Sequence, residues 1–157
     1  LAMLCASPCL VRKPGWQHAV SEAIFDQFAE DLDTGFHLTL ERFLALEAMG
    51  SDQALAESRK LRAQIFTRGE PATTALKQGL ALLKQTDLRD ALRTLRQPSV
   101  WLAGARDRIV PFQAMQWASE QCGGDFQRVE RAGHAPFIGH ADRVIAGLEP
   151  LLEPLRA

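Results

Sequence analysis

The sequence predicts an α/β fold, because three short strand-like stretches alternate with helical patterns. Leu1–Ala6 is a continuous apolar run, and Ser99–Gly104 is apolar over most of its length. Such runs are typical of strands that are buried on both faces of a parallel sheet. Phe126–Glu130 alternates apolar and polar side chains and predicts a third strand. We expect these three strands to be consecutive parallel neighbours at one edge of the sheet.

A block of helices separates the first strand from the second. Apolar residues recur every three or four positions over residues 16–50, with an interruption at 31–35. A Ser-Asp cap then predicts a helix over 51–67, and two threonines open another over 73–85. We expect Leu55, Leu61 and Ile65 to form the inward, apolar face of the third helix. The pattern therefore predicts a four-helix cap inserted into the α/β core.

The chain divides into three parts on this basis. Residues 1–15 form a core strand with its loop, and residues 16–85 form the helical cap, or lid. Residues 86–157 form the rest of the α/β core. Within that last part, a short helix is expected from Thr86 and a final one over 141–152.

Composition narrows the classes of function. Of the 157 residues 46% are hydrophobic, which is enough for a buried core and argues against disorder. The net charge of −1 argues against nucleic acid as the main partner. The chain lacks an apolar run of about 18 residues, so no membrane span is expected, and its apolar start lacks the basic region of a signal peptide. Three cysteines without zinc-site spacing favour a reduced, cytoplasmic setting.

Two polar residues follow the second and third predicted strands. Asp107 comes shortly after Gly104, and His134 lies in a loop after residues 126–130. Functional groups collect at the carboxyl ends of parallel strands, so both side chains are expected at one edge of the sheet. There an aspartate can accept the Nδ1–H of a histidine, fix its tautomer and stabilise its protonated form. Alone, each residue would be interpreted as structural; together they favour an acid–base pair.

The pair resembles the acid and the base of the α/β-hydrolase triad, whose nucleophile comes earlier in the chain. The expected Gly-x-Ser-x-Gly motif is absent, because none of the six serines has that context. No upstream glycine-rich loop offers an oxyanion hole either. The chain therefore looks like the C-terminal part of an enzyme and is expected to be inactive alone. A missing N-terminal part of the same enzyme would supply the serine and the oxyanion-hole amides.

Several stretches carry a narrower resemblance. They are Ala6–Cys9, Glu41–Leu46 with Met49-Gly50, Thr86–Arg89 and His134–Ile138. In order and spacing they resemble the pimeloyl-[acyl-carrier protein] methyl ester esterase family of biotin synthesis, the BioH family of α/β-hydrolases. The resemblance implies an α/β-hydrolase fold with a helical cap and a serine carboxylesterase activity. It implies no metal and no organic cofactor.

The resemblance also implies roles for individual residues. His134 would be the general base, and Asp107 would orient it. The acyl chain would contact five consecutive cap residues, namely Phe43, Leu44, Ala45, Leu46 and Glu47. The apolar members would form a wall for methylene groups, each of which contributes about 0.8 kcal/mol when buried. The alternative is that these side chains form the cap's own core.

A carrier protein is implied as the partner. Because that carrier is acidic, the surface that binds it should be basic. The third predicted helix carries a cluster of basic residues, and the helix before it contributes one more basic residue. The residues expected to bind the carrier are Arg42, Arg59, Lys60 and Arg62. The alternative is that these charges form an ordinary solvated helix face.

Two other functions stay open. A different capped α/β-hydrolase, such as a short-chain esterase or a carbon–carbon bond hydrolase, would use the same Asp107 and His134. Its cap would not discriminate acids bound to a carrier, so carrier-dependent turnover separates the two enzymes. A non-catalytic module that binds a partner helix would also explain the absence of a nucleophile motif.

Overall fold

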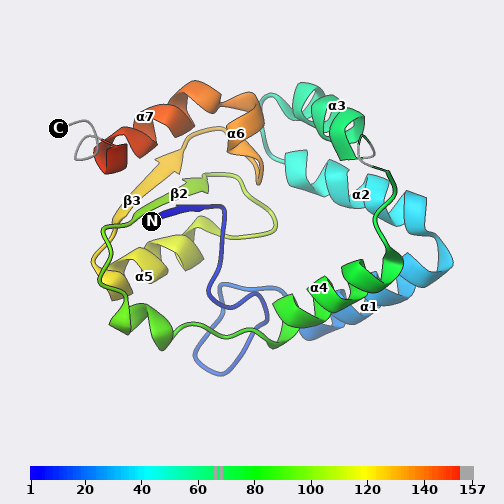
Figure 1. Ribbon diagram of the computed structural model, residues 1–157, viewed down its shortest axis with the longest axis horizontal. Coiled ribbons are helices and arrows are strands. Elements are labelled where there is room, and N and C mark those ends of the chain that lie inside the picture. Colours follow the sequence, from blue (N-terminus) through cyan, green and yellow to red (C-terminus); the bar gives the residue numbers. More distant parts are fainter. Residues whose placement is uncertain (66, 68, 153–157) are drawn as a thin grey trace.

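The computed structural model describes residues 1–65, 67 and 69–152. Its sheet has the strands β1 (Ala2–Leu4), β2 (Val100–Gly104) and β3 (Asp125–Val129) in the order β1-β2-β3 (Figure 1). Both pairings are parallel. The prediction of three consecutive parallel neighbours is therefore confirmed, with β1 shorter than the predicted Leu1–Ala6.

Helices cover both faces of this sheet (Figure 1). Successive side chains of β2 point to opposite faces, so each face has its own core. Trp101 packs in one cluster with Met115 of α5, and Leu102 packs in the other with Val144 of α7. The whole of β2 is buried, which agrees with its apolar sequence. The helices that accompany the sheet are α5 (Phe112–Cys122), α6 (Pro136–Gly139) and α7 (Ala141–Leu152).

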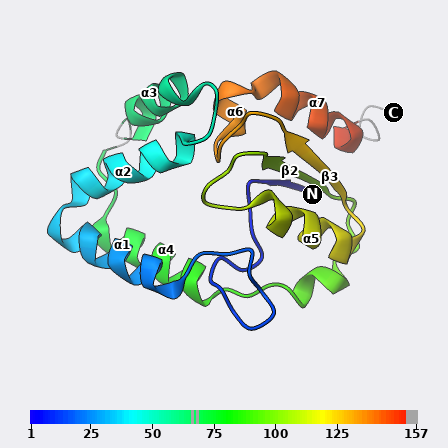
Figure 2. The same ribbon diagram turned by 180° about the vertical axis from the view of Figure 1, so that it is seen from behind.

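The predicted four-helix cap lies beyond the carboxyl ends of the strands (Figure 1). Helix α1 packs beside α2 and α4, and α2 packs against α3. The view from behind shows α1 and α4 side by side, with α2 and α3 nearer to α6 (Figure 2). The bounds of the cap helices are α1 (Glu22–Thr34), α2 (Phe36–Ala48), α3 (Ala54–Ile65) and α4 (Thr73–Gln85).

The first cap helix begins at Glu22, so the predicted helical start at Trp16 is wrong. Trp16 is buried, and its indole Nε1–H donates to the carbonyl of Cys9 at 2.8 Å. Its backbone N–H donates to the carbonyl of Lys13 at 2.8 Å across a turn in which Gly15 has φ +73°. The periodic apolar residues of this stretch therefore belong to a packed loop, because the tryptophan anchors the chain before the helix starts.

The predicted helix from Thr86 is also wrong. The carboxylate of Asp87 accepts from Arg89 Nε and Nη2, both at 2.8 Å, and forms a salt bridge with Lys13 Nζ at 3.1 Å. Arg89 first, and Lys13 with it, hold the pKa of Asp87 well below its usual range. Asp87 thus stabilises the non-helical loop that follows α4 through these bonds to Arg89 and Lys13. The short 3₁₀ helix η1 begins later, at Ala91–Thr94.

The inward face of α3 differs from the prediction. Leu61 and Ile65 are partly buried, but Leu55 is 68% exposed, whereas Glu57, two residues further on, is fully buried. Ser51 Oγ donates to Glu57 Oε1 at 2.7 Å, while Oε2 is buried without a hydrogen-bond partner among the described residues. Gly139 of α6 lies so close that a Cβ there would meet Glu57 Oε1 at 2.0 Å. Helix α3 therefore places the carboxyl group of Glu57 against α6.

None of the helices in the described part of the chain has both the length and the apolarity needed to cross a bilayer.

Candidate active site

Asp107 lies in the turn after β2, and its carboxylate is held from two sides. Its side chain is fully buried. Oδ1 accepts backbone N–H groups from Ile109 at 2.8 Å and from Val110 at 3.0 Å. These two bonds orient the carboxylate, so that Oδ2 is directed at the loop that follows β3.

His134 lies in that loop. Its Nδ1 is 2.8 Å from Asp107 Oδ2. Because an ionised carboxylate only accepts, Nδ1 carries the proton of the neutral ring, and Nε2 has the free lone pair. The side chain is 22% exposed, in contrast to the buried aspartate. The arrangement can take up a proton at Nε2 and stabilise the resulting imidazolium through Asp107.

The carboxyl end of α2 supports the histidine loop. The carbonyl of Glu47 accepts the backbone N–H of His134 at 2.9 Å. Gly133 lies so close to this helix end that a Cβ there would be 2.9 Å from the carbonyls of Glu47 and Met49. A glycine before His134 therefore lets the cap and the loop approach each other.

Glu47 brings a second carboxyl close to the pair. Burial raises the pKa of Glu47, and the charge of Asp107 raises it further, while His134 acts in the opposite direction. Of the five predicted acyl contacts, Glu47 is thus the one whose charge acts directly on the pair. Its side chain is half-buried.

The other four predicted acyl contacts differ in burial. Leu44 is only 3% exposed and belongs to the interior of the cap, which fits the alternative interpretation for this residue. Phe43 and Leu46 are half-buried, and Ala45 is exposed. The ring of Phe43 packs against Phe28 of α1, with 5.5 Å between the ring centroids.

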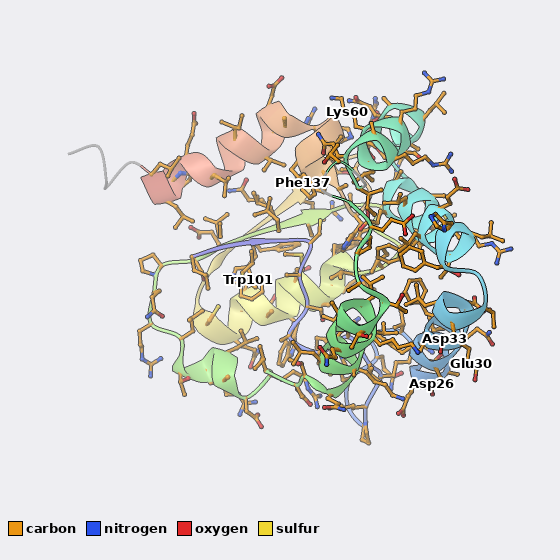
Figure 3. All side chains as sticks on the ribbon, turned by 45° about the vertical axis from the view of Figure 1, so that its right-hand side comes forward. Asp26, Glu30, Asp33, Lys60, Trp101 and Phe137 are labelled. Carbon is orange, nitrogen blue, oxygen red and sulfur yellow. The ribbon has the colours of Figure 1, made fainter. Side chains whose placement is uncertain are left out.

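The predicted carrier-binding cations are all exposed. Arg42 lies on α2, and Arg59, Lys60 and Arg62 lie on α3. Within the described residues, none of the four forms a salt bridge. Figure 3 shows Lys60 on α3, well apart from the acidic side chains of α1. Those acidic residues are Asp26, Glu30 and Asp33.

Sequence reasoning missed Cys5. It follows β1, as Asp107 follows β2 and His134 follows β3, so the same strand-end rule could have found it. It is buried, and its φ of +44° is unusual for a residue other than glycine. Burial, with the charge of Asp107, raises the pKa of Cys5 to about 12.

A second histidine lies outside this pair. His140 Nε2 is 3.3 Å from Asp52 Oδ1 and 3.9 Å from Glu57 Oε1. Its side chain is nearly buried between the start of α3 and the end of α6. It therefore contacts acidic residues of the cap rather than Asp107.

The fold and this site define a class of protein. A model of the alpha/beta hydrolase family matches residues 2–147, and the chain belongs to that family. Solved structures agree on the fold. An esterase from Exiguobacterium antarcticum superposes with a TM-score of 0.81 at 18% identity, covering 99% of this chain and 56% of that one. A bromoperoxidase from Bacillus anthracis gives 0.78 at 17% identity, covering 94% and 57%.

Relatives with much higher identity share one name. The pimeloyl-[acyl-carrier protein] methyl ester esterase of Stenotrophomonas maltophilia (strain R551-3) is 51% identical over 150 residues, which are 95% of this chain and 58% of that protein. The protein of the same name from Xanthomonas campestris pv. campestris (strain B100) is 46% identical over 99% of this chain and 62% of its own length. The chain thus spans about three fifths of the length of these relatives.

Proposed function

We propose that this chain supplies the cap and the acid–base pair of a serine carboxylesterase, which hydrolyses pimeloyl-[acyl-carrier protein] methyl ester in biotin synthesis. The observation that carries the proposal is the 2.8 Å contact between His134 Nδ1 and the buried carboxylate of Asp107. Relatives about half identical to this chain bear the name of that esterase. The nucleophilic serine and the oxyanion-hole amides would come from a part of the protein outside residues 1–157.

The geometry supports a two-step acyl transfer. His134 Nε2 removes the proton of the serine as its oxygen attacks the ester carbonyl, and Asp107 stabilises the imidazolium. His134 then gives that proton to the departing methoxide, which leaves as methanol. In the second step His134 takes a proton from water, the hydroxide attacks the acyl-serine, and the free carboxylate is released with the serine restored. These steps require no metal or organic cofactor.

We place the acyl chain along the carboxyl-terminal half of α2. This helix ends at the His134 loop, so a chain that lies on it runs toward the base. Phe43 and Leu46 offer partly exposed apolar surface for methylene groups, and Glu47 lies nearest to the pair. Leu44 would support this surface indirectly, because its side chain is packed in the interior of the cap.

The exposed cations of α2 and α3 are proposed to bind the acidic carrier protein. We expect Arg59→Glu, made in the full-length protein, to raise KM for the carrier-bound ester and to leave small esters almost unaffected. The effect should shrink with added salt, because such contacts are screened over about 10 Å at 0.1 M ionic strength. Steady-state kinetics with both substrates, at two salt concentrations, measures this.

Arg93→Glu is the matched control, because it makes the same charge change at an exposed position of η1. It should leave both KM values unchanged. Equal losses on both substrates for Arg59→Glu would assign that residue to folding. Wild-type turnover that does not depend on the carrier would favour a general short-chain esterase.

The chain by itself is expected to be inactive. A purified 157-residue chain should hydrolyse p-nitrophenyl esters no faster than background, because it has neither the nucleophile motif nor the oxyanion donors. The assay compares the chain with its own His134→Ala variant. Hydrolysis by the chain that His134→Ala abolishes would show that the nucleophile lies within it.

A cytoplasmic setting stays a prediction. It agrees with the three free cysteines, Cys5, Cys9 and Cys122.

A further inference from the structure

A residue with a side chain that could bind a metal follows each strand of the sheet, so that all three residues lie at the carboxyl edge. Cys5 follows β1, Asp107 follows β2, and His134 follows β3. One potential ligand atom from each residue lies within 4.8 Å of the other two. The parallel order β1-β2-β3 thus brings a sulfur, an oxygen and a nitrogen together, although 129 positions separate the first residue from the last.

The backbone of Cys5 is consistent with a thiol held at a defined place. Its N–H continues the sheet by donating to the carbonyl of Leu102 at 2.9 Å. Its φ of +44° then turns the chain out of the strand. Non-glycine residues adopt this region rarely, and such residues cluster at functional sites. The local structure fixes the thiol beside Asp107 at an energetic cost to the backbone.

The other two cysteines are placed differently. Cys9 Sγ donates to the carbonyl of Val11 at 3.3 Å, and Cys122 Sγ donates to the carbonyl of Ala118 at 3.3 Å. Each of these thiols is therefore bound to the backbone of its own segment. Within the described residues, the group of three potential ligands contains Cys5 and neither of the others.

The donor set suits one class of metal ion. Thiolate, imidazole and carboxylate are the three types of ligand that Zn²⁺ takes, in tetrahedral sites with bonds of about 2.0–2.3 Å. Mg²⁺ and Ca²⁺ prefer oxygen ligands and would not use the thiol. Three protein ligands leave the fourth position for water, as in zinc sites with an open coordination position.

We propose that Cys5, Asp107 and His134 form an inhibitory binding site for a divalent cation of the zinc type. Binding releases the proton of the Cys5 thiol to solvent, and the proton on Nδ1 of His134 is replaced by one on Nε2, so that the ring stays a neutral imidazole. The cation then lies between His134 and Asp107. The carboxylate can no longer stabilise an imidazolium, and the ring can no longer take up a proton with its help. Only this inhibitory consequence rests on the proposed function; the binding of the metal does not.

The binding test uses Co²⁺ as a spectroscopic probe on the reduced full-length protein under anaerobic conditions. We expect a thiolate-to-cobalt charge-transfer band in the near ultraviolet that saturates at one Co²⁺ per chain and disappears on addition of Zn²⁺. Cys5→Ala should lose this band, and the matched variant Cys9→Ala should keep it. No saturable band in the wild-type protein would overturn the proposal, as would a band that survives Cys5→Ala.

The activity test compares the esterase rate of each variant in the presence of Zn²⁺ with the rate of the same variant without metal. Zn²⁺ should inhibit the wild-type esterase reversibly, with recovery on addition of a chelator. Cys5→Ser should require at least tenfold more Zn²⁺ for half-inhibition, and Cys9→Ala should match the wild type. Equal sensitivity of Cys5→Ser and wild type would overturn the inhibitory role. If the cobalt band forms but the protein hydrolyses no ester, the metal site stands and the proposed function fails.

Discussion

His134→Ala and Asp107→Asn, made in the full-length protein, should each lower kcat on the order of 10⁴-fold. The alanine removes the base. The asparagine donates where the aspartate accepts, so it favours the tautomer with the proton on Nε2, which cannot accept the proton of a serine. Asp107 also holds its own turn through the N–H groups of Ile109 and Val110, and an asparagine oxygen preserves these bonds. Steady-state rates on a small ester measure both losses.

His18→Ala is the control for this series, because His18 is an exposed histidine on the loop before α1. It should keep the wild-type rate. Near wild-type rates for His134→Ala would show that another base acts. His140 would then be the first alternative, although it lies next to Asp52 rather than Asp107.

Gly104→Ala should cause the largest loss of stability among single methyl additions. A Cβ at Gly104 would lie 1.9 Å from the carbonyl oxygen of Gly133 and 2.9 Å from that of Ala132. Both obstacles are backbone atoms, which cannot rotate away as the end of a side chain can. Either β2 or the His134 loop must shift, and we expect a loss of about 3 kcal/mol or more in the free energy of unfolding. Urea denaturation of the full-length protein measures it.

The matched control is Gly79→Ala. Gly79 lies inside α4, and a Cβ there would meet nothing within 4 Å. Alanine favours a helix interior over glycine, so this variant should gain about 0.5–1 kcal/mol. Equal stability of the Gly104 and Gly79 variants would mean that β2 and the histidine loop do not approach each other as closely as the structure has them.

The sheet and the contact between Asp107 and His134 could be predicted from the sequence, because both depend on local patterns. Apolar runs identify the strands, and a residue just after a parallel strand is placed at the carboxyl edge by the strand itself. The hydrogen bond between Asp107 and His134 needed no knowledge of the cap. These predictions therefore stay correct even where the predicted bounds of neighbouring helices are wrong.

Features that depend on tertiary contacts could not be predicted. Trp16 has the spacing of a helix, but the bond from its indole to Cys9 fastens it in a loop. Glu57 is an acidic residue and yet fully buried, and only the folded chain brings Ser51 Oγ close enough to donate to it across the turn before α3. Glu47 holds the His134 loop through its backbone carbonyl, which accepts the N–H of His134. A contact of this kind cannot be predicted from a pattern of side chains.

The central claim is that Asp107 and His134 activate a serine that lies outside these 157 residues. Labelling of the full-length protein with a fluorophosphonate, followed by peptide mass spectrometry, tests it most directly. The account predicts one labelled serine, within a Gly-x-Ser-x-Gly motif that is not part of this chain, and a labelling rate that falls sharply in His134→Ala. A label on any of the six serines printed here, or an unchanged rate in that variant, would contradict it.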